Sequence, residues 1–410
     1  MRAHRLVVFV CALGCSSGTR APAPAVVQVR PGIEVLLSDS AHLIAGKRLG
    51  LLTNHTGIDH RGRRDADLLR AVHGARLTVL YSPEHGFRGT EDRSGLPDSQ
   101  DSATGLPIYS LYGGSRSAAR SALDSIDVLL IDLQDIGARF YTYIATATIL
   151  MRDAARAGKR VIVLDRPDPI DGRHVQGNVR ARLTEPESAL VGFLPVPMRH
   201  GMTLGELALM ANDLMAIGAD LIVVPAAGWT RTMFYDETGL PWVKPSPNMP
   251  NLESALLYPG LCLFEGTNLS VGRGTGTAFQ VLGAPWLDPA KVIERVRAYG
   301  IAGVDIIPTS FTPMASTDGK YSGITLRGLH LRVTDREHAD PTKVAVALLA
   351  ALRAVHPDQF QFRAAHFDRL TTGPELRTAL EAGRSPQDIW DSWEGDLARF
   401  RANRKKYLVY

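Results

Sequence analysis

Short apolar runs alternate with amphipathic stretches along the first 260 residues of the chain. The runs have the length of β-strands and are rich in Val, Ile and Leu at successive positions, which is typical of strands covered on both faces. They occupy residues 49–53, 77–82, 128–133, 161–164 and 221–224. The amphipathic stretches between them predict helices at residues 65–72, 143–157 and 204–217. The last begins with Thr203 and Glu206, the spacing of a capping box. This alternation predicts an α/β fold with a doubly wound parallel sheet.

The pattern changes beyond residues 258–260. A glycine-rich stretch is followed by a helical pattern at 290–298, an alternating strand-like run at 324–333 and a second helical pattern at 342–355. This order is typical of a smaller α+β domain. A chain of 410 residues also suits two domains, because single cores stop growing near about 250–300 residues. We therefore expect one domain at residues 32–257 and another at 258–410.

The N-terminus has the features of an export signal. Arg2 and Arg5 precede an apolar run at residues 6–13 and then small residues, so we expect residues 1–14 to be a signal peptide. Residues 15–31 are rich in Ser, Ala and Pro and are expected to form a flexible tether. The protein is accordingly predicted to be exported, to the periplasm or the cell surface.

Cys15 is the predicted lipid anchor. Residues 12–15, Ala-Leu-Gly-Cys, are similar to a bacterial lipobox, in which the cysteine is acylated after cleavage. The alternative is ordinary cleavage further on, near residues 21–25. No later run is long and apolar enough for a spanning helix, so membrane contact is expected only through the anchor.

Composition excludes several classes of protein. The chain has 46 Lys and Arg against 42 Asp and Glu, with no basic cluster interleaved with aromatic residues, so nucleic acid is not an expected partner. Of three cysteines only Cys262 falls within the predicted domains, which rules out a disulfide framework. The motifs of serine hydrolases, P-loop NTPases and common zinc sites are absent.

Polar residues follow four of the apolar runs. They are Asn54-His55, Glu84-His85, Gln134-Asp135 and Asp165-Arg166. Because the carboxyl ends of parallel strands meet at one edge of a sheet, these groups are predicted to face one crevice.

Glu84 lies in the most informative of these segments, residues 82–89. A carboxylate and an imidazole directly after a buried strand, in a turn with two glycines, suit a general acid at the mouth of a cleft. The alternative is that Glu84 caps the next element or pairs with Arg88.

Residues 133–143 supply a second cluster. Asp135, or alternatively Asp132, offers a carboxylate, Arg139 can bind an anion in bidentate fashion, and Tyr141 and Tyr143 can stack on a ring. A helix N-terminus with structural Asp and Arg residues explains this segment equally well.

Three further segments carry polar or conformationally restricted residues. Glu265 and Arg273 flank a stretch whose glycines at 272, 274 and 276 do not follow the first strand of a βαβ unit, so a dinucleotide site is not expected. A loop that closely approaches a sugar or backbone explains these glycines better. The acids of residues 165–172 are typical of turns more than of a metal site. Residues 245–251 contain too many prolines for a helix and predict a stiff loop.

From about Val35 to Tyr410 the chain resembles the NamZ-type exo-β-N-acetylmuramidases, a bacterial family once known as a domain of unknown function. The matching blocks are residues 52–54, 83–89, 134–143, 165–169, 246–250 and 264–270. The resemblance implies a Rossmann-like N-terminal domain, a smaller C-terminal domain and a cleft between them. It also implies release of terminal N-acetylmuramic acid from the non-reducing end of peptidoglycan fragments. Glu84 matches the glutamate thought to be catalytic in that family.

Glycoside hydrolysis ordinarily uses two carboxyl groups, so Glu84 needs a partner. We expect Asp135, then Glu265, then Asp132. The lactyl carboxylate of N-acetylmuramic acid requires a cation, for which Arg139 and Arg273 are the candidates. The full set of expected substrate-binding residues is Asn54, His85, Arg88, Arg139, Tyr141, Tyr143, Asn248 and Arg273. No metal or nucleotide is required. The alternatives are a non-catalytic sugar- or wall-binding lipoprotein and, on weaker grounds, a nucleotide-sugar or dinucleotide enzyme.

Overall fold

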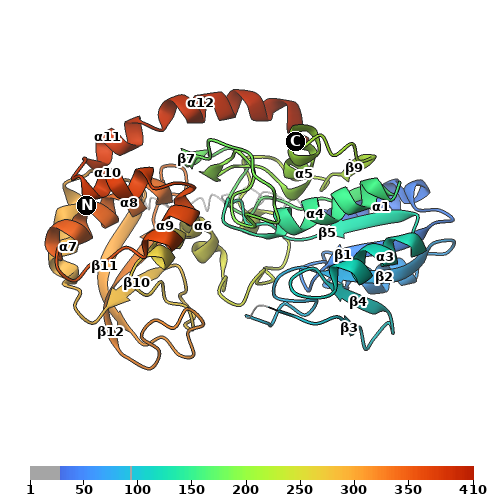
Figure 1. Ribbon diagram of the computed structural model, residues 1–410, viewed down its shortest axis with the longest axis horizontal. Coiled ribbons are helices and arrows are strands. Elements are labelled where there is room, and N and C mark those ends of the chain that lie inside the picture. Colours follow the sequence, from blue (N-terminus) through green and yellow to red (C-terminus); the bar gives the residue numbers. More distant parts are fainter. Residues whose placement is uncertain (1–27, 93–94) are drawn as a thin grey trace, which may run out of the picture.

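The computed structural model describes residues 28–92 and 95–410. Two lobes lie side by side, one built on a seven-stranded sheet and the other on a three-stranded sheet (Figure 1). We call them the large lobe and the small lobe. The predicted fold class, a mainly parallel α/β sheet with a smaller C-terminal α+β region, is confirmed.

The sheet of the large lobe has the strand order β3-β4-β2-β1-β5-β6-β9. Its strands are β1 Arg48–Thr53, β2 Arg76–Ser82, β3 Ser99–Gln100, β4 Pro107–Ser110, β5 Val128–Asp132, β6 Arg160–Leu164 and β9 Leu221–Val224. All neighbours are parallel except β3 and β4. The five predicted strands are β1, β2, β5, β6 and β9. Because β1 lies between β2 and β5, the order reverses there, and the carboxyl ends of these strands open a crevice.

Helices cover both faces of this sheet. They are α1 Gly32–Asp39, α2 Asp65–Arg70, α3 Arg116–Ser121, α4 Tyr143–Arg156 and α5 Leu204–Leu214. Strand β5 shows why its sequence is apolar at every position: Leu129 and Ile131 belong to the hydrophobic core on one face, and Leu130 belongs to the core on the other. The capping box of α5 is confirmed, because the Thr203 hydroxyl accepts from the Glu206 amide and the Glu206 carboxylate accepts from the Thr203 amide.

The small lobe contains an antiparallel sheet in the order β10-β12-β11 and most of the remaining helices. Its elements are α6 Leu252–Leu261, β10 Val281–Ala284, α7 Pro289–Arg297, β11 Val304–Phe311, β12 Leu326–Val333, α8 Pro341–Val355, α9 Ala364–Thr371, α10 Glu375–Glu381 and α11 Pro386–Asp391. Helix α6 packs so tightly on the start of α8 that a Cβ on Gly260 would lie 1.8 Å from the Pro341 carbonyl oxygen. Glycine is therefore required at this position of α6.

Helix α12, Glu394–Asn403, returns from the small lobe to the large lobe along one side of the molecule (Figure 1). At its end the Arg404 guanidinium donates to the backbone carbonyls of Gly172, Arg173, His200 and Gly201. These four bonds satisfy a buried cation with backbone oxygens alone, and they anchor α12 to the large lobe.

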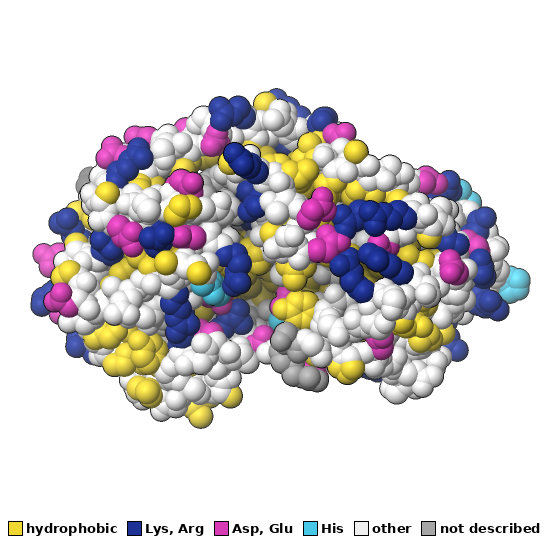
Figure 2. Space-filling model, viewed as in Figure 1, with side chains coloured by type: hydrophobic (Ala, Val, Ile, Leu, Met, Phe, Trp, Pro, Cys, Tyr) yellow, Lys and Arg dark blue, Asp and Glu magenta, His cyan; other side chains and the backbone are white. Residues whose placement is uncertain are grey.

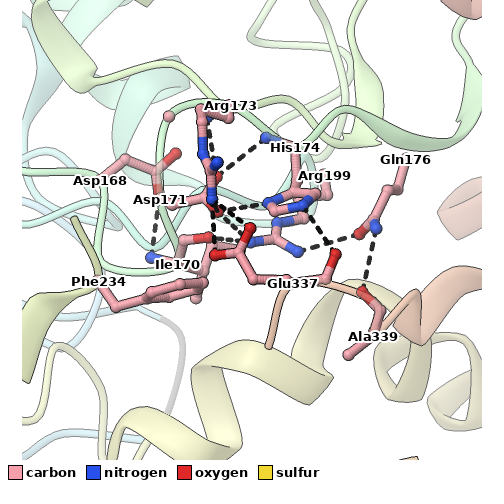
Figure 3. A network of polar contacts seen from close by, with 12 residues as sticks. Asp168, Ile170, Asp171, Arg173, His174, Gln176, Arg199, Phe234, Glu337 and Ala339 are labelled. Carbon is pink, nitrogen blue, oxygen red and sulfur yellow. Dashed lines mark hydrogen bonds and ion pairs between the residues drawn. The ribbon is translucent and has the colours of Figure 1, made fainter. Parts of the chain in front are cut away.

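A second junction between the lobes is the polar network in Figure 3. Arg173 forms a bidentate ion pair with Glu337 at 2.7 Å for each contact. His174 Nε2 lies 3.2 Å from the Glu337 carbonyl oxygen, and its Nδ1 pairs with Asp171. Gln176 donates to the Ala339 carbonyl at 3.1 Å. The two junctions together hold the lobes in one relative position.

The structure modifies the expected organisation near the N-terminus. Residues 28–31, assigned to the tether, pack on the large lobe: Val29 is fully buried, and Arg30 pairs with Ala227 through two backbone hydrogen bonds. The signal peptide and Cys15 lie outside the described residues. The boundary expected at residue 257 stays a prediction, and that residue lies inside α6. No helix in the described part of the chain is long and apolar enough to span a membrane.

Candidate active site

A cavity of about 180 Å³ lies between the lobes, where the surface is hollowed (Figure 2). The large lobe lines it with Glu84, His85, Asp92, Phe140, Tyr141, Thr142, Tyr143 and Val191, and the loop before α6 adds Ser246 and Met249. The small lobe contributes Tyr258, Cys262, Glu265, Arg273, Phe279, His366, Arg369 and Leu370. The cavity therefore combines the carboxyl ends of β2 and β5 with helices and loops of the small lobe.

Glu84 lies at the cavity, two residues after β2 ends at Ser82. His85 and Gly86 both have positive φ, 69° and 73°, and this turns the chain back sharply after the strand. The half-buried Glu84 carboxylate accepts a hydrogen bond of 2.5 Å from the Thr142 hydroxyl. Tyr112 lies close by, since burial and the charge of Glu84 raise the pKa of Tyr112 to about 12.

Tyr141 and Tyr143 form an aromatic wall of the cavity, with ring centroids 4.8 Å apart at 72°. The Tyr143 hydroxyl donates to the Pro245 carbonyl at 2.5 Å and accepts from the Asn54 side-chain amide at 2.8 Å. Asn54 itself does not line the cavity. Its position explains the polar residue after β1, because Asn54 holds Tyr143 in place.

Glu265 lines the cavity from the small lobe, near the end of a short 3₁₀ helix, Cys262–Gly266. Its carboxylate forms an ion pair with Arg273 at 2.5 Å. The buried ammonium of Lys320 donates to the carbonyls of Phe264, Glu265 and Leu269. These bonds hold the backbone that carries Glu265, while burial lowers the pKa of Lys320 to about 8.

Asp92 is a third carboxylate in the cavity that sequence reasoning missed. It accepts from the Asn248 side-chain amide at 2.8 Å and from the Thr317 hydroxyl at 2.6 Å, and Arg273 lies 3.8 Å away. Burial alone would raise the pKa of Asp92, but the Thr317 hydrogen bond and the Arg273 charge lower it. Asp92 therefore links a loop of the large lobe to the small lobe, and Asn248 contacts this carboxylate without lining the cavity.

The other two carboxylates expected as partners of Glu84 do not line the cavity. Asp135 is buried, with one oxygen accepting from the Gly137 amide and the other without a partner among the described residues. Burial raises the pKa of Asp135 to about 7. Asp132 is fully buried in an ion pair with Arg166. Of the expected partners of Glu84, only Glu265 lies at the cavity.

Two arginines expected to bind substrate lie elsewhere. Arg88 is exposed, pairs with Asp101 at 2.9 Å and lines a separate depression. Arg139 is buried and donates to the Asn178 side chain and to the Leu370 carbonyl, among other backbone oxygens. Burial lowers the pKa of Arg139 to about 9. Because its two terminal nitrogens donate to protein oxygens, including the carbonyl of the lining residue Leu370, Arg139 supports the cavity wall from behind.

The glycine-rich segment approaches protein backbone. A Cβ on Gly274, whose φ is 77°, would lie 2.2 Å from the Met314 carbonyl oxygen. The acids of residues 165–172 behave as turn residues, because Asp168 and Asp171 each accept from the amide two residues ahead. Within residues 28–92 and 95–410, no cluster of three or more His, Cys, Asp or Glu residues could hold a metal ion.

Sequence reasoning also missed Thr142, His366 and Arg369, which line the cavity. Thr142 lies within residues 133–143, but a single hydroxyl is a weaker signal than the phenols and charges beside it. His366 and Arg369 lie one turn apart on α9, and nothing in their local sequence indicates that this helix meets the large lobe.

Comparison with known proteins gives consistent matches over the whole fold. Residues 49–253 match the family described as exo-β-N-acetylmuramidase NamZ, N-terminal, and residues 256–410 match its C-terminal counterpart. The chain is 40% identical over 386 residues to the peptidoglycan β-N-acetylmuramidase NamZ of Bacillus subtilis strain 168, covering 93% of this chain and 92% of that protein.

Two crystal structures of DUF1343 family proteins from Bacteroides fragilis are also similar. One has a TM-score of 0.84 at 34% identity, covering 94% of this chain and 99% of its own. The other has a TM-score of 0.72 at 32% identity, covering 93% and 99%.

Proposed function

Because the chain belongs to the NamZ exo-β-N-acetylmuramidase family, we propose that it is an exo-acting glycoside hydrolase that releases terminal N-acetylmuramic acid from the non-reducing end of peptidoglycan fragments. The enzyme is thus a glycosidase. Glu84 is the general acid and Glu265 the second carboxylate. The observation that carries this proposal is that both residues, one from each lobe, line the same cavity.

The chemistry requires two carboxyl groups in different roles. One protonates the departing glycosidic oxygen, and the other activates water or attacks the anomeric carbon. Glu84 accepts a hydrogen bond from Thr142 and lies next to the Tyr112 hydroxyl, and these contacts position its carboxyl group at the cavity. Glu265 is paired with Arg273, which suits the carboxylate that faces a developing positive charge.

The shape of the site supports action at a chain end. Asp92 lines the cavity and is bonded to Thr317 of the small lobe and to Asn248, so these contacts connect the lobes beside the cavity. A connection between the lobes at this point is an obstacle to a continuous polymer and favours a terminal sugar. The aromatic rings of Tyr141 and Tyr143 offer the apolar surface on which a sugar face packs.

Export and lipid anchoring through Cys15 remain part of this proposal. The substrate polymer lies outside the cytoplasm, which agrees with the signal-like residues 1–14. Growth of expressing cells with labelled palmitate should label the wild-type chain but not Cys15→Ser. Equal labelling of both chains would exclude the anchor.

The activity is tested with a chromogenic β-N-acetylmuraminide and the matching glucosaminide. We expect hydrolysis of the muraminide alone. Glu84→Gln should reduce kcat by about 10²–10⁴-fold, the usual contribution of a general acid, while sugar binding persists. Glu294→Gln, on the exposed side of α7, is the matched control and should leave the rate unchanged. Intact muraminide at high protein concentration, together with measurable binding, would instead favour a non-catalytic sugar-binding protein.

A further inference from the structure

Arg369 lines the cavity without a carboxylate partner among the residues that the structure describes. Within the described residues, its guanidinium lies 3.4 Å from Nδ1 of His366 on the same helix. Burial lowers the pKa of His366 and the charge of Arg369 lowers it further, and because a guanidinium has only donors, Nδ1 of His366 accepts this contact. Positive side chains border the hollow on the side of the small lobe (Figure 2). Arg369 is thus a cation with donors left for a ligand.

The charges around the cavity make this unpaired cation informative. Three carboxylates line the cavity, Glu84, Asp92 and Glu265, and the other arginine, Arg273, is paired with Glu265 and lies near Asp92. An anionic ligand is repelled by three carboxylates unless it finds a free cation. Among the described lining residues, Arg369 is the cation that meets this requirement.

The position of Arg369 relative to the catalytic acid is set by the lobe contact. Arg139 of the large lobe donates to the Leu370 carbonyl at 3.1 Å, and Asn178 donates to the Thr371 carbonyl at 2.8 Å. Both carbonyls belong to the last turn of α9. These bonds hold the end of the helix that carries Arg369 against the large lobe.

Arg369 and Glu84 line the same cavity, one from the small lobe and one from the large lobe. The charge of Glu84 raises the pKa of Tyr112, whereas the charge of Arg369 acts in the opposite direction. Tyr112 therefore lies within electrostatic reach of both groups. A sugar whose glycosidic oxygen meets Glu84 therefore occupies a cavity whose wall includes His366, Arg369 and Leu370 of α9.

We infer that Arg369 binds the lactyl carboxylate of N-acetylmuramic acid and is the residue that selects this sugar over N-acetylglucosamine. The inference rests on the proposed function, because that function supplies the anionic substituent. It replaces Arg139 and Arg273, the cations expected from the sequence. Arg139 does not line the cavity, and the charge of Arg273 is paired with Glu265, so neither offers an unpaired cation to a ligand there.

The kinetic test compares a chromogenic β-N-acetylmuraminide with the same compound carrying a methyl ester on its lactyl carboxylate. Arg369→Met should lower kcat/KM about 10- to 100-fold on the acid, the loss expected for a charged hydrogen bond, and less than about threefold on the ester. The kcat/KM of Arg369→Lys on the acid should lie between the values of the wild type and Arg369→Met. Arg363→Met, at the other end of α9 and outside the cavity lining, is the matched control. An equal fall on both substrates, or no fall on either, would overturn the inference.

A binding measurement separates this inference from the proposed function. Titration calorimetry with free N-acetylmuramic acid and N-acetylglucosamine needs no turnover. If the wild type hydrolyses neither chromogenic substrate, the proposed function fails. A preference for N-acetylmuramic acid that is lost in Arg369→Met would then still support the role of Arg369, and the same preference in both proteins would contradict it.

Discussion

The Thr142 hydroxyl donates to one carboxylate oxygen of Glu84 across 2.5 Å, joining the loop after β5 to the turn after β2. The bond orients the carboxylate at the cavity. Thr142 precedes α4, whose first residue, Tyr143, lines the same cavity. The acid and the aromatic wall are therefore positioned by one stretch of backbone.

Loss of this hydroxyl should reduce turnover more than binding. Thr142→Val keeps the shape of the side chain but removes the donor, so we expect kcat to fall about tenfold with KM nearly unchanged. Steady-state kinetics on the muraminide measure both. Thr148→Val is the control, because the Thr148 hydroxyl is buried on the same helix without a described partner. A Thr142→Val enzyme with normal kcat would show that the bond does not orient the acid.

The two remaining carboxylates of the cavity should have different roles. Glu265→Gln is expected to reduce kcat by about 10²–10⁴-fold, as for the loss of a reacting carboxylate. Asp92→Asn disturbs contacts between the lobes and should act mainly by raising KM. Steady-state kinetics of the two variants, measured side by side, decide which residue is the second carboxylate. A larger loss of kcat in Asp92→Asn than in Glu265→Gln would assign that role to Asp92.

The raised pKa of Asp135 should make the free energy of unfolding fall as the pH rises. Because burial raises its pKa in the folded protein to about 7, the folded state keeps a proton that the unfolded state loses. The free energy of unfolding should therefore fall between about pH 4 and pH 7. Asp135→Asn removes this dependence. It should be more stable than the wild type at pH 8 and equally stable at pH 4 in urea denaturation.

Asp124→Asn, at an exposed position, should leave the pH dependence of unfolding unchanged. The same Asp135→Asn protein also tests the expectation from sequence that Asp135 is catalytic. We expect it to retain activity, since the side chain does not line the cavity. A loss of 10²-fold or more in kcat would restore Asp135 as a candidate.

Arg166 should be essential for stability. It pairs with the fully buried Asp132 and lies 3.9 Å from the equally buried Asp65. Arg166→Met leaves two carboxylates without a cation and should cost about 3–5 kcal/mol of unfolding free energy. Arg160→Met breaks the exposed pair with Asp220 and should cost at most about 1 kcal/mol. Similar losses in urea denaturation of the two variants would contradict this difference.

Much of the large lobe could be predicted from the sequence because its strands are buried on both faces. Glu84 and Tyr143 were found in this way. The small lobe gave weaker signals: α6 contains Pro259, which argues locally against a helix, and its packing on α8 prevails over that preference.

The limits of the site prediction have a physical cause. Some polar residues at the sheet edge line the cavity, and others are buried by segments that pack on them. Those segments are distant in the sequence, so the local pattern does not indicate which residues they bury. Asp135 and Arg139 had suitable chemistry, but neighbouring segments buried both. Arg369 is separated from Glu84 by 285 positions and becomes relevant only because α9 meets the large lobe.

The cavity whose wall is shared by both lobes has an evolutionary consequence. Two family profiles meet between residues 253 and 256, which invites the view that the halves are interchangeable modules. Neither half holds the whole cavity lining, since Glu84 belongs to one half and Glu265 to the other. A gene that exchanged either half for an unrelated one would lose part of the cavity wall, so we expect the two halves to be inherited together.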